Sequence, residues 1–375
     1  MLDIRFGLAT DLHIALPHTI PATTDRFHRT EISIATFEAA LSTFDQLDLD
    51  FLLLAGDLTQ DGEIDNHAWL AQRLGQLSYP VYVVPGNHDI LSPQGSNTTI
   101  GVADFGRYYA KFGYANTDQL YYTQQIAPQV RLIGLNSIFF DGDKQTYRGR
   151  VDPEQMAWLG EVLAASNDEL ILVMVHHNVI EHLPGQADSR MGQRYMLQNA
   201  PELLELLARH GVQLVFTGHL HVQDVAQAPY SPPIYDIATG STVSYPHPFR
   251  IMRYRETSPG VGHLQIESRH VQQIPGWEDL QTRSREYVGN RSSHFVKRML
   301  TAEPLGLSEE AADQMLPELR YLWADIARGD AHFDFPQFEP AVRRYFEQFS
   351  CGAAIDNATI LSVQRPVGAT LGAPR

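Results

Sequence analysis

An apolar run ends abruptly in a polar turn in the segment FLLLAGDLTQDG, which spans residues 51–62. Its apolar part, residues 51–55, does not alternate with polar residues, so it is typical of a strand that is covered on both faces. Gly56 and Asp57 follow at once, at the point where the strand must end. The segment therefore predicts a buried strand of an α/β sheet with a carboxylate at its carboxyl end.

The same kind of apolar run recurs on both sides of this segment. The other runs cover residues 4–9, 81–84, 130–135, 170–175 and 212–217, and later ones cover 234–238, 249–254 and 261–266. Amphipathic stretches lie between the early runs, at residues 29–47, 64–76, 153–165 and 201–210. Strands that alternate with helices in this way predict the α/β class, with the later runs extending the sheet or forming a second one.

Polar residues that can bind metals follow five of these strands. They are Asp11 and His13, Asp57, Asn87 with His88, His176, and His219 with His221. In open α/β sheets, ligands bind at the carboxyl ends of the strands. Carboxylate, imidazole and amide oxygen together favour Zn, Mn or Fe. Two such ions about 3.5–4 Å apart can orient a bridging hydroxide and stabilise phosphoryl displacement, so we expect a dinuclear metal centre.

The composition excludes several classes of protein. The chain has 375 residues, of which 43% are hydrophobic, and its formal net charge is −16. This acidic balance disfavours a broad nucleic-acid surface, which would need a basic face. Cys351 is the single cysteine, so the chain can form no internal disulfide and no zinc site with several thiolates. We expect neither a signal peptide nor a membrane span, and hence a cytoplasmic location.

The character of the sequence changes near Ile274-Pro275-Gly276. Helical patterns follow at residues 283–300, 308–328 and 338–349, and the segment 352–375 reads as a tail on the surface. We therefore predict a catalytic domain over residues 1–270 and a mainly helical extension over 271–375. The extension could cap the active site, mediate a homodimer or cover an apolar sheet face, and the sequence does not choose among these.

The five polar motifs, in this order, resemble the calcineurin-like metallophosphoesterase superfamily. The residues that match are Asp11-Leu12-His13, Gly56-Asp57, Gly86-Asn87-His88-Asp89, His176 and Gly218-His219-Leu220-His221. The segment that opens this section looks most like the branch of class III cyclic-nucleotide phosphodiesterases and glycerophosphodiesterases. The resemblance covers about residues 1–255. It implies a four-layer α/β/β/α metallophosphoesterase sandwich.

The resemblance also implies a role for each matched residue. One metal would be bound by Asp11, His13, Asp57 and His221, and the second by Asp57, Asn87, His176 and His219. His88 would contact phosphate and stabilise the transition state or protonate the leaving oxygen, so that Asp57 and His88 are the expected catalytic residues. The implied reaction is hydrolysis of a small phosphodiester, such as a cyclic nucleotide or a glycerophosphodiester.

Three rival functions and several neighbouring residues stay open at this point. A phosphomonoesterase could use the same centre, a nuclease is disfavoured by the acidic balance, and a binding protein would keep only a vestigial site. His177 could contact substrate, orient a ligand or simply pack. Asp61 and Asp89 are interpreted as orienting or capping residues, and His247 as a surface histidine. The long interval between His13 and Asp57 suggests an inserted loop near the site, with His18, Asp25 and His28 in it.

Overall fold

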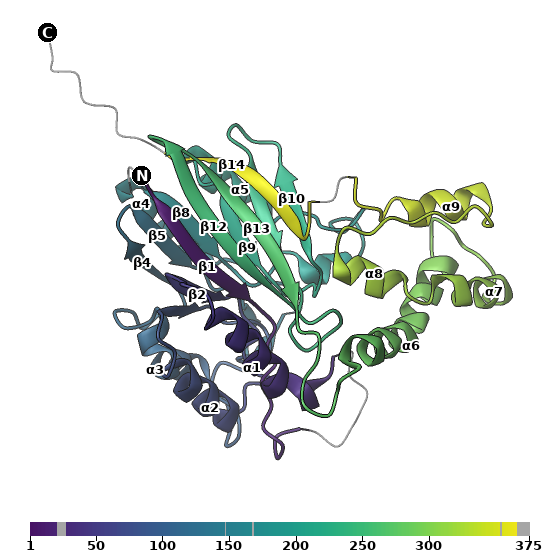
Figure 1. Ribbon diagram of the computed structural model, residues 1–375, viewed down its shortest axis with the longest axis horizontal. Helices are drawn as coiled ribbons and strands as arrows, with labels where there is room; N and C mark the ends of the chain where they lie inside the picture. Colours follow the sequence, from purple (N-terminus) through teal and green to yellow (C-terminus); the bar gives the residue numbers. More distant parts are fainter. Residues whose placement is uncertain (21–27, 147, 167–168, 353–354, 366–375) are drawn as a thin grey trace, which may run out of the picture.

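The computed structural model describes residues 1–20, 28–146, 148–166, 169–352 and 355–365, so that Asp25 lies outside the described residues. Two six-stranded sheets form the centre of the molecule (Figure 1). Within these ranges, none of the helices has both the length and the apolar character that a bilayer crossing requires.

The first sheet has the strand order β14-β13-β12-β1-β2-β3. Its strands are β1 (Asp3–Ala9), β2 (Phe51–Leu54), β3 (Val81–Val83), β12 (Pro248–Ser258), β13 (Val261–His270) and β14 (Ala358–Gln364). Strands β1, β2 and β3 are parallel, so their carboxyl ends meet at one edge. All four residues of β2 are buried, as its apolar sequence predicts.

The second sheet has the strand order β10-β11-β9-β8-β5-β4. Its strands are β4 (Tyr122–Ala127), β5 (Val130–Gly134), β8 (Leu170–Met174), β9 (Leu214–Thr217), β10 (Asp224–Ala228) and β11 (Ile234–Ala238). Strands β5, β8, β9 and β11 are parallel. The ring of Phe6 in β1 meets that of Phe216 in β9 edge to face, with centroids 5.7 Å apart, so the two sheets pack on each other.

Helices cover the outer faces of both sheets. On the first sheet, α1 (Ser33–Phe44), α2 (Ile64–Leu74) and α3 (Val102–Tyr108) join the same apolar core as β1 and β2. On the second, α4 (Pro153–Ala165) and α5 (Ala200–Arg209) form a separate core with β8 and β9. The four-layer α/β/β/α sandwich is therefore confirmed. Short elements complete the domain: β6 (Phe140–Asp141), β7 (Lys144–Gln145), and the 3-10 turns Thr30–Ile32, Ala110–Phe112 and Gly192–Tyr195.

The C-terminal region is helical as far as residue 347 and then returns to the first sheet. Its helices are α6 (Leu280–Thr301), α7 (Glu309–Leu319), α8 (Leu322–Arg328) and α9 (Pro340–Glu347), and β14 follows them (Figure 1). The single helix expected over 308–328 is two helices, and Pro317, which cannot donate a helical hydrogen bond, precedes the break.

The interpretation of residues 352–375 as a tail packed on the surface is wrong for residues 358–364, and its residues 353–354 and 366–375 lie outside the described residues. These residues form β14, which pairs antiparallel with β13, and they bury Leu361 and Val363 on one face. The helices before β14 form their own apolar cluster, and this cluster includes Leu220 and Val222 of the loop after β9. The extension therefore packs directly against a loop that the sequence assigns to the site. The domain division at residue 270 stays a prediction.

Candidate metal centre

The carboxyl ends of β1, β2, β8 and β9 bring six acidic and imidazole side chains together where the two sheets meet. They form two groups that share Asp57: Asp11, His13, Asp57 and His221 in the first, and Asp57, His176 and His219 in the second. In each group, one donor atom from every residue lies within 4.8 Å of the others. These are the side chains that the sequence assigns to two adjacent ions.

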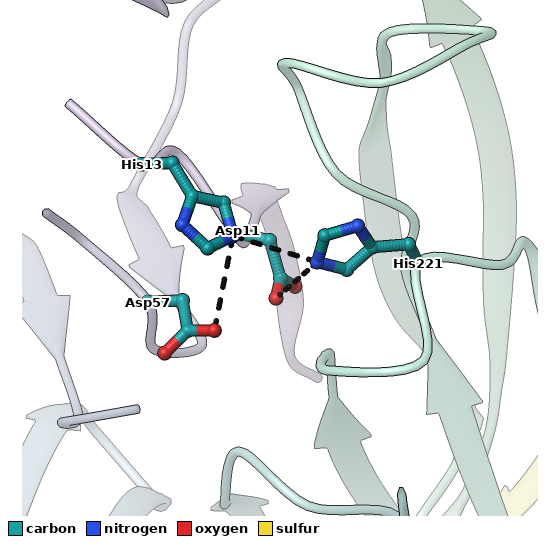
Figure 2. A group of neighbouring side chains, drawn as sticks. All are labelled: Asp11, His13, Asp57 and His221. Atoms are coloured by element: carbon teal, nitrogen blue, oxygen red, sulfur yellow. Dashed lines mark hydrogen bonds and ion pairs between the residues drawn. The ribbon is translucent and has the colours of Figure 1, made fainter. Parts of the chain in front are cut away.

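The first group is drawn in Figure 2, where the imidazoles of His13 and His221 point toward the two carboxylates. His221 Nε2 lies 3.1 Å from Asp11 Oδ1, and His13 Nε2 lies 3.8 Å from Asp57 Oδ2. The two Nε2 atoms are 3.5 Å apart. Asp11, His13 and Asp57 are fully or almost fully buried, whereas the His221 side chain is 18% exposed, so the group is open to solvent on the His221 side.

The second group is centred on His176. Its Nε2 lies 3.2 Å from Asp57 Oδ2 and 3.2 Å from the amide oxygen of Asn87. Its Nδ1 is 2.8 Å from the carbonyl of Ala55, and this contact fixes the ring so that Nε2 faces the shared carboxylate. His219 completes the group, with Nε2 3.1 Å from the carbonyl of Arg194. Asn87, the seventh expected ligand, therefore lies beside this group.

The backbone at these positions adopts an unusual conformation. Asp11, His13, Asp57, His219 and His221 all have positive φ, between 43° and 66°. Residues other than glycine rarely occupy this region, and such strain is concentrated at functional sites, where the surrounding structure holds it. The fold therefore maintains a costly local conformation at five of the seven expected ligands.

Two glycines let the strand ends approach each other closely. A Cβ atom on Gly86 would lie 2.2 Å from Asp57 Oδ1, and one on Gly218 would lie 2.1 Å from Thr10 Oγ1 and 2.5 Å from Asp11 Oδ2. Neither position can accept a side chain without moving a carboxylate. The glycines in the motifs are thus required by the packing of the site.

The chemistry of these donors fits a pair of metal ions. Two buried carboxylates, several imidazoles and one amide oxygen form a set that suits Zn, Mn or Fe, and a carboxylate with two oxygens can be shared by two ions. Burial alone would raise the pKa of Asp57, but the charges of His176 and His88 outweigh it and hold this pKa well below its usual range. Asp57 is therefore ionised, as a ligand must be.

His88 lies next to the two groups but belongs to neither. Its amide donates to Asp57 Oδ1 at 2.8 Å, and its Nδ1 lies 2.7 Å from the carbonyl of Gln60 and 3.1 Å from Asp61 Oδ1. Burial lowers the pKa of His88, but Asp57 and Asp61 outweigh burial and raise it to about 9. In the absence of metal, these two carboxylates thus favour the protonated form of the ring.

Other residues hold the loops of the site in place. Asp89 accepts hydrogen bonds from the amides of Leu58, Thr59 and Gly86, so it orients two of the loops as expected. His177 is buried, and its Nδ1 lies 2.8 Å from Ser137 Oγ. Its ring centroid is 4.3 Å from that of His219, so His177 packs against the ring of an expected ligand.

Two side chains that lie beside the expected ligands were given no role by the sequence analysis. The ring of His28 stacks on that of His13, with centroids 4.1 Å apart, and its Nε2 lies 2.9 Å from Gln60 Oε1. The long loop was the one signal for His28, and no pattern indicated Gln60. His18, from the same loop, instead pairs with Asp65 at 2.9 Å on the surface.

The interpretation of His247 as a surface histidine is wrong. Its side chain is fully buried, with Nδ1 2.9 Å from the carbonyl of Thr242 and Nε2 2.7 Å from Ser284 Oγ of α6. The prolines around it suggested an exposed loop, but α6 packs over that loop. His247 therefore connects the core to the C-terminal region.

Comparisons with known proteins agree with this geometry. The chain is 28% identical over 190 residues to a probable cyclic nucleotide phosphodiesterase of Pseudoalteromonas sp. (strain SM9913), covering 49% of this chain and 61% of that protein. It is 25% identical over 178 residues to a probable glycerophosphodiester phosphodiesterase of Arcobacter nitrofigilis, covering 46% and 56%. Each match thus spans less than two thirds of the relative.

A solved structure and a family match extend the comparison. A dimetal phosphatase from Danio rerio superposes with a TM-score of 0.52 at 18% identity, covering 72% of this chain and 96% of that one, so the two share a fold. Residues 4–223, which hold all the expected ligands, match the family described as calcineurin-like phosphoesterase. The chain therefore belongs to the calcineurin-like phosphoesterase family.

Proposed function

We propose that this protein is a metal-dependent phosphodiesterase that hydrolyses a small substrate, either a cyclic nucleotide or a glycerophosphodiester. The observation that supports it most is the pair of donor groups that share the buried Asp57. The names of the relatives, which are cyclic-nucleotide and glycerophosphodiester phosphodiesterases, support the substrate class.

In this proposal the seven expected ligands hold two ions. Asp11, His13 and His221 would bind the first, Asn87, His176 and His219 the second, and Asp57 both. Two ions bound there would activate water and offset the charge that develops on phosphate. Iron, manganese and zinc all suit this donor set.

His88 is proposed to protonate the leaving oxygen. Its Nδ1 is held by the Gln60 carbonyl, so Nε2 is the nitrogen left for a phosphate ester oxygen. The carboxylates of Asp57 and Asp61 favour the imidazolium, and a general acid must begin the reaction in that form. Asp61 and Gln60 would then set the orientation of the ring rather than touch substrate.

A comparison of substrates tests the proposal. We would strip the protein of metal, reload it with Mn²⁺, Fe²⁺ or Zn²⁺, and measure kcat/KM for bis(p-nitrophenyl) phosphate and p-nitrophenyl phosphate in parallel. We expect a clear preference for the diester, followed by turnover of 3′,5′-cyclic nucleotides or glycerophosphodiesters in a substrate panel. A preference for the monoester would instead assign a phosphomonoesterase to the same centre.

The net charge of −16 disfavours a nucleic-acid substrate, so we propose that none is cleaved. A cytoplasmic location and a homodimer stay predictions.

A further inference from the structure

A cavity of about 400 Å³ lies between the start of β10 and the C-terminal region. One wall is formed by residues 181–184 and 222–224, and the other by the end of α8, residues 348–352 and Asp356. The two walls come from segments far apart in the sequence, which Figure 1 shows meeting near the start of β10. The expected ligands of the dinuclear centre do not line this cavity.

Asp330, Cys351 and Asp356 converge at this cavity. One carboxylate oxygen of each aspartate and the Cys351 sulfur lie within 4.8 Å of one another. Cys351 and Asp356 line the cavity directly, and Asp330 lies between the lining residues Gly329 and Ala331. Two carboxylates and a thiol thus share one small volume.

One oxygen of Asp356 lacks a partner within the described part of the chain. Asp356 is only 3% exposed, and its Oδ2 accepts the amide of Asp330 at 2.6 Å. Its Oδ1 is buried and has no hydrogen-bond partner among the residues that the structure describes. A buried carboxylate oxygen without a partner is costly, so this atom needs either a proton, which Asp224 could share, or a bound cation.

The negative charge of Asp224, next to Asp356, would favour a cation bound between the carboxylates. Burial and repulsion by Asp224 both disfavour the charged form of Asp356 and raise its pKa to about 6. His182 is close to Asp224, with Nδ1 2.5 Å from Asp224 Oδ2, and it is therefore engaged there.

Arg250 lies beneath the same carboxylates but does not pair with them. Its buried guanidinium donates to the hydroxyls of Thr239 and Ser268 and to the carbonyls of Ala238 and Asp356. All these acceptors are neutral, so Arg250 leaves the carboxylate of Asp356 without a direct cationic partner. Arg250 thus attracts Asp356, Asp224 and Asp330 only through its charge, and the coordination positions of the Asp356 carboxylate that face the cavity stay open to a cation.

We propose that Asp330, Cys351 and Asp356 bind a divalent cation, best matched by Zn²⁺, at a site separate from the dinuclear centre. A thiolate with two carboxylates suits this borderline-soft ion, whereas Mg²⁺ and Ca²⁺ prefer oxygen alone. Asp330 follows α8, while Cys351 and Asp356 lie between α9 and β14. The ion would therefore tie the end of α8 to the segment that leads back into the sheet.

The single cysteine makes this site separately measurable. Because the chain contains no other thiol, the reaction of Cys351 with Ellman's reagent reports on this site and not on the dinuclear centre. We would strip the full chain with a chelator and reload one portion with Zn²⁺. We expect zinc to slow the thiol reaction at least tenfold, since a bound thiolate is protected. Equal rates with and without zinc would overturn the proposal, and a proton shared by Asp224 and Asp356 would give that result.

Variants and a second metal complete the test. Asp356→Asn should abolish the protection, whereas Asp334→Asn should retain it, because the Asp334 side chain is 62% exposed and pairs with Arg343. With Co²⁺, the native chain should show a sulfur-to-cobalt charge-transfer band in the near ultraviolet. Protection that survives in Asp356→Asn, or cobalt-loaded protein without the band, would contradict the assignment.

Two further variants separate the two centres. Cys351→Ser is conservative at a half-buried position, so it should fold, lose the cobalt band and bind one metal fewer per chain. Asp57→Asn disturbs the dinuclear centre alone and should keep the band. A Cys351→Ser protein with an unchanged metal content would overturn the proposal even if the phosphodiesterase activity is confirmed.

Discussion

The Nε2 atoms of His13 and His221 lie 3.5 Å apart although the two residues follow strands of different sheets. His13 follows β1 of the first sheet, and His221 follows β9 of the second. The distance between these imidazoles is therefore set by how the sheets pack, through contacts such as Phe6 against Phe216. A centre built in this way has its donors positioned by the core of the protein rather than by a mobile loop.

Asp57→Asn should remove both metal binding and activity. Asp57 is the residue common to the two donor groups, and an amide offers one oxygen and no charge in place of a carboxylate. We expect kcat/KM for the diester to fall by more than the ~10–100-fold that loss of an orienting partner costs at a metal site. Steady-state kinetics and metal analysis of the purified variant measure the two effects. Asp65→Asn, at an exposed acid that contacts His18, is the control and should behave as native.

His88→Asn should lower kcat and leave the metal content unchanged. His88 lies outside both donor groups, so its loss removes a proton donor rather than a ligand. The expected decrease is about 10²–10⁴-fold, as for other general acids. The decrease should be smaller for a p-nitrophenolate leaving group, which needs no proton, than for an alkoxide. Equal decreases for both leaving groups would count against the proton-donor role.

Asp89→Ala should destabilise the fold. Asp89 accepts the amides of Leu58, Thr59 and Gly86, and alanine would leave these buried donors without an acceptor. We expect the free energy of unfolding to fall by at least about 2 kcal/mol. Urea denaturation of metal-free protein measures this change. Asp89→Asn retains an acceptor oxygen and should therefore lose less; an equal loss would point to the charge of Asp89 instead of its hydrogen bonds.

The sequence predicts the sheets and the expected ligands because both depend on local patterns. Asp11, Asp57 and His176 each follow an apolar run. The parallel strands β1 and β2 place Asp11 and Asp57 at one edge of the first sheet, and His176 follows β8 of the second sheet. The positions of His28 and Gln60 at the site, and the strand β14, could not be predicted from such local patterns. The stacking of His28 on His13 and the pairing of β14 with β13 depend on tertiary packing between segments that are distant in sequence.

The final prediction concerns a buried charge outside the dinuclear centre. His182 lies between two carboxylates, with Nδ1 2.5 Å from Asp224 Oδ2 and Nε2 3.2 Å from Asp236 Oδ2. Burial alone would lower the pKa of His182, but Asp236 and Asp224 outweigh it and raise the pKa to about 10. Asp236 also accepts a hydrogen bond from the hydroxyl of Thr217, the last residue of β9 before the His219 loop. The ion pair of His182 with Asp236 therefore lies directly beneath that loop of the site.

Because the pKa of His182 is higher in the folded than in the unfolded protein, its stabilising effect is complete below the unfolded value of 6.5. The effect is lost as the pH rises through about 10. The free energy of unfolding should therefore fall between these values in the native protein. His182→Gln should be less stable by about 3–5 kcal/mol at the lower pH, since one partner of a buried ion pair is removed, and should fall less with pH.

Urea denaturation of chelator-treated protein across this pH range tests the prediction. His270→Gln is the matched control: burial, with Arg328 and Arg250, lowers the pKa of His270 to about 4, so His270 titrates below the window. Its slope between pH 6.5 and pH 10 should equal the native slope. If His182→Gln also keeps the native slope, then His182 is not the group whose charge stabilises the fold, and the Asp224 and Asp236 carboxylates must be neutralised by another cation.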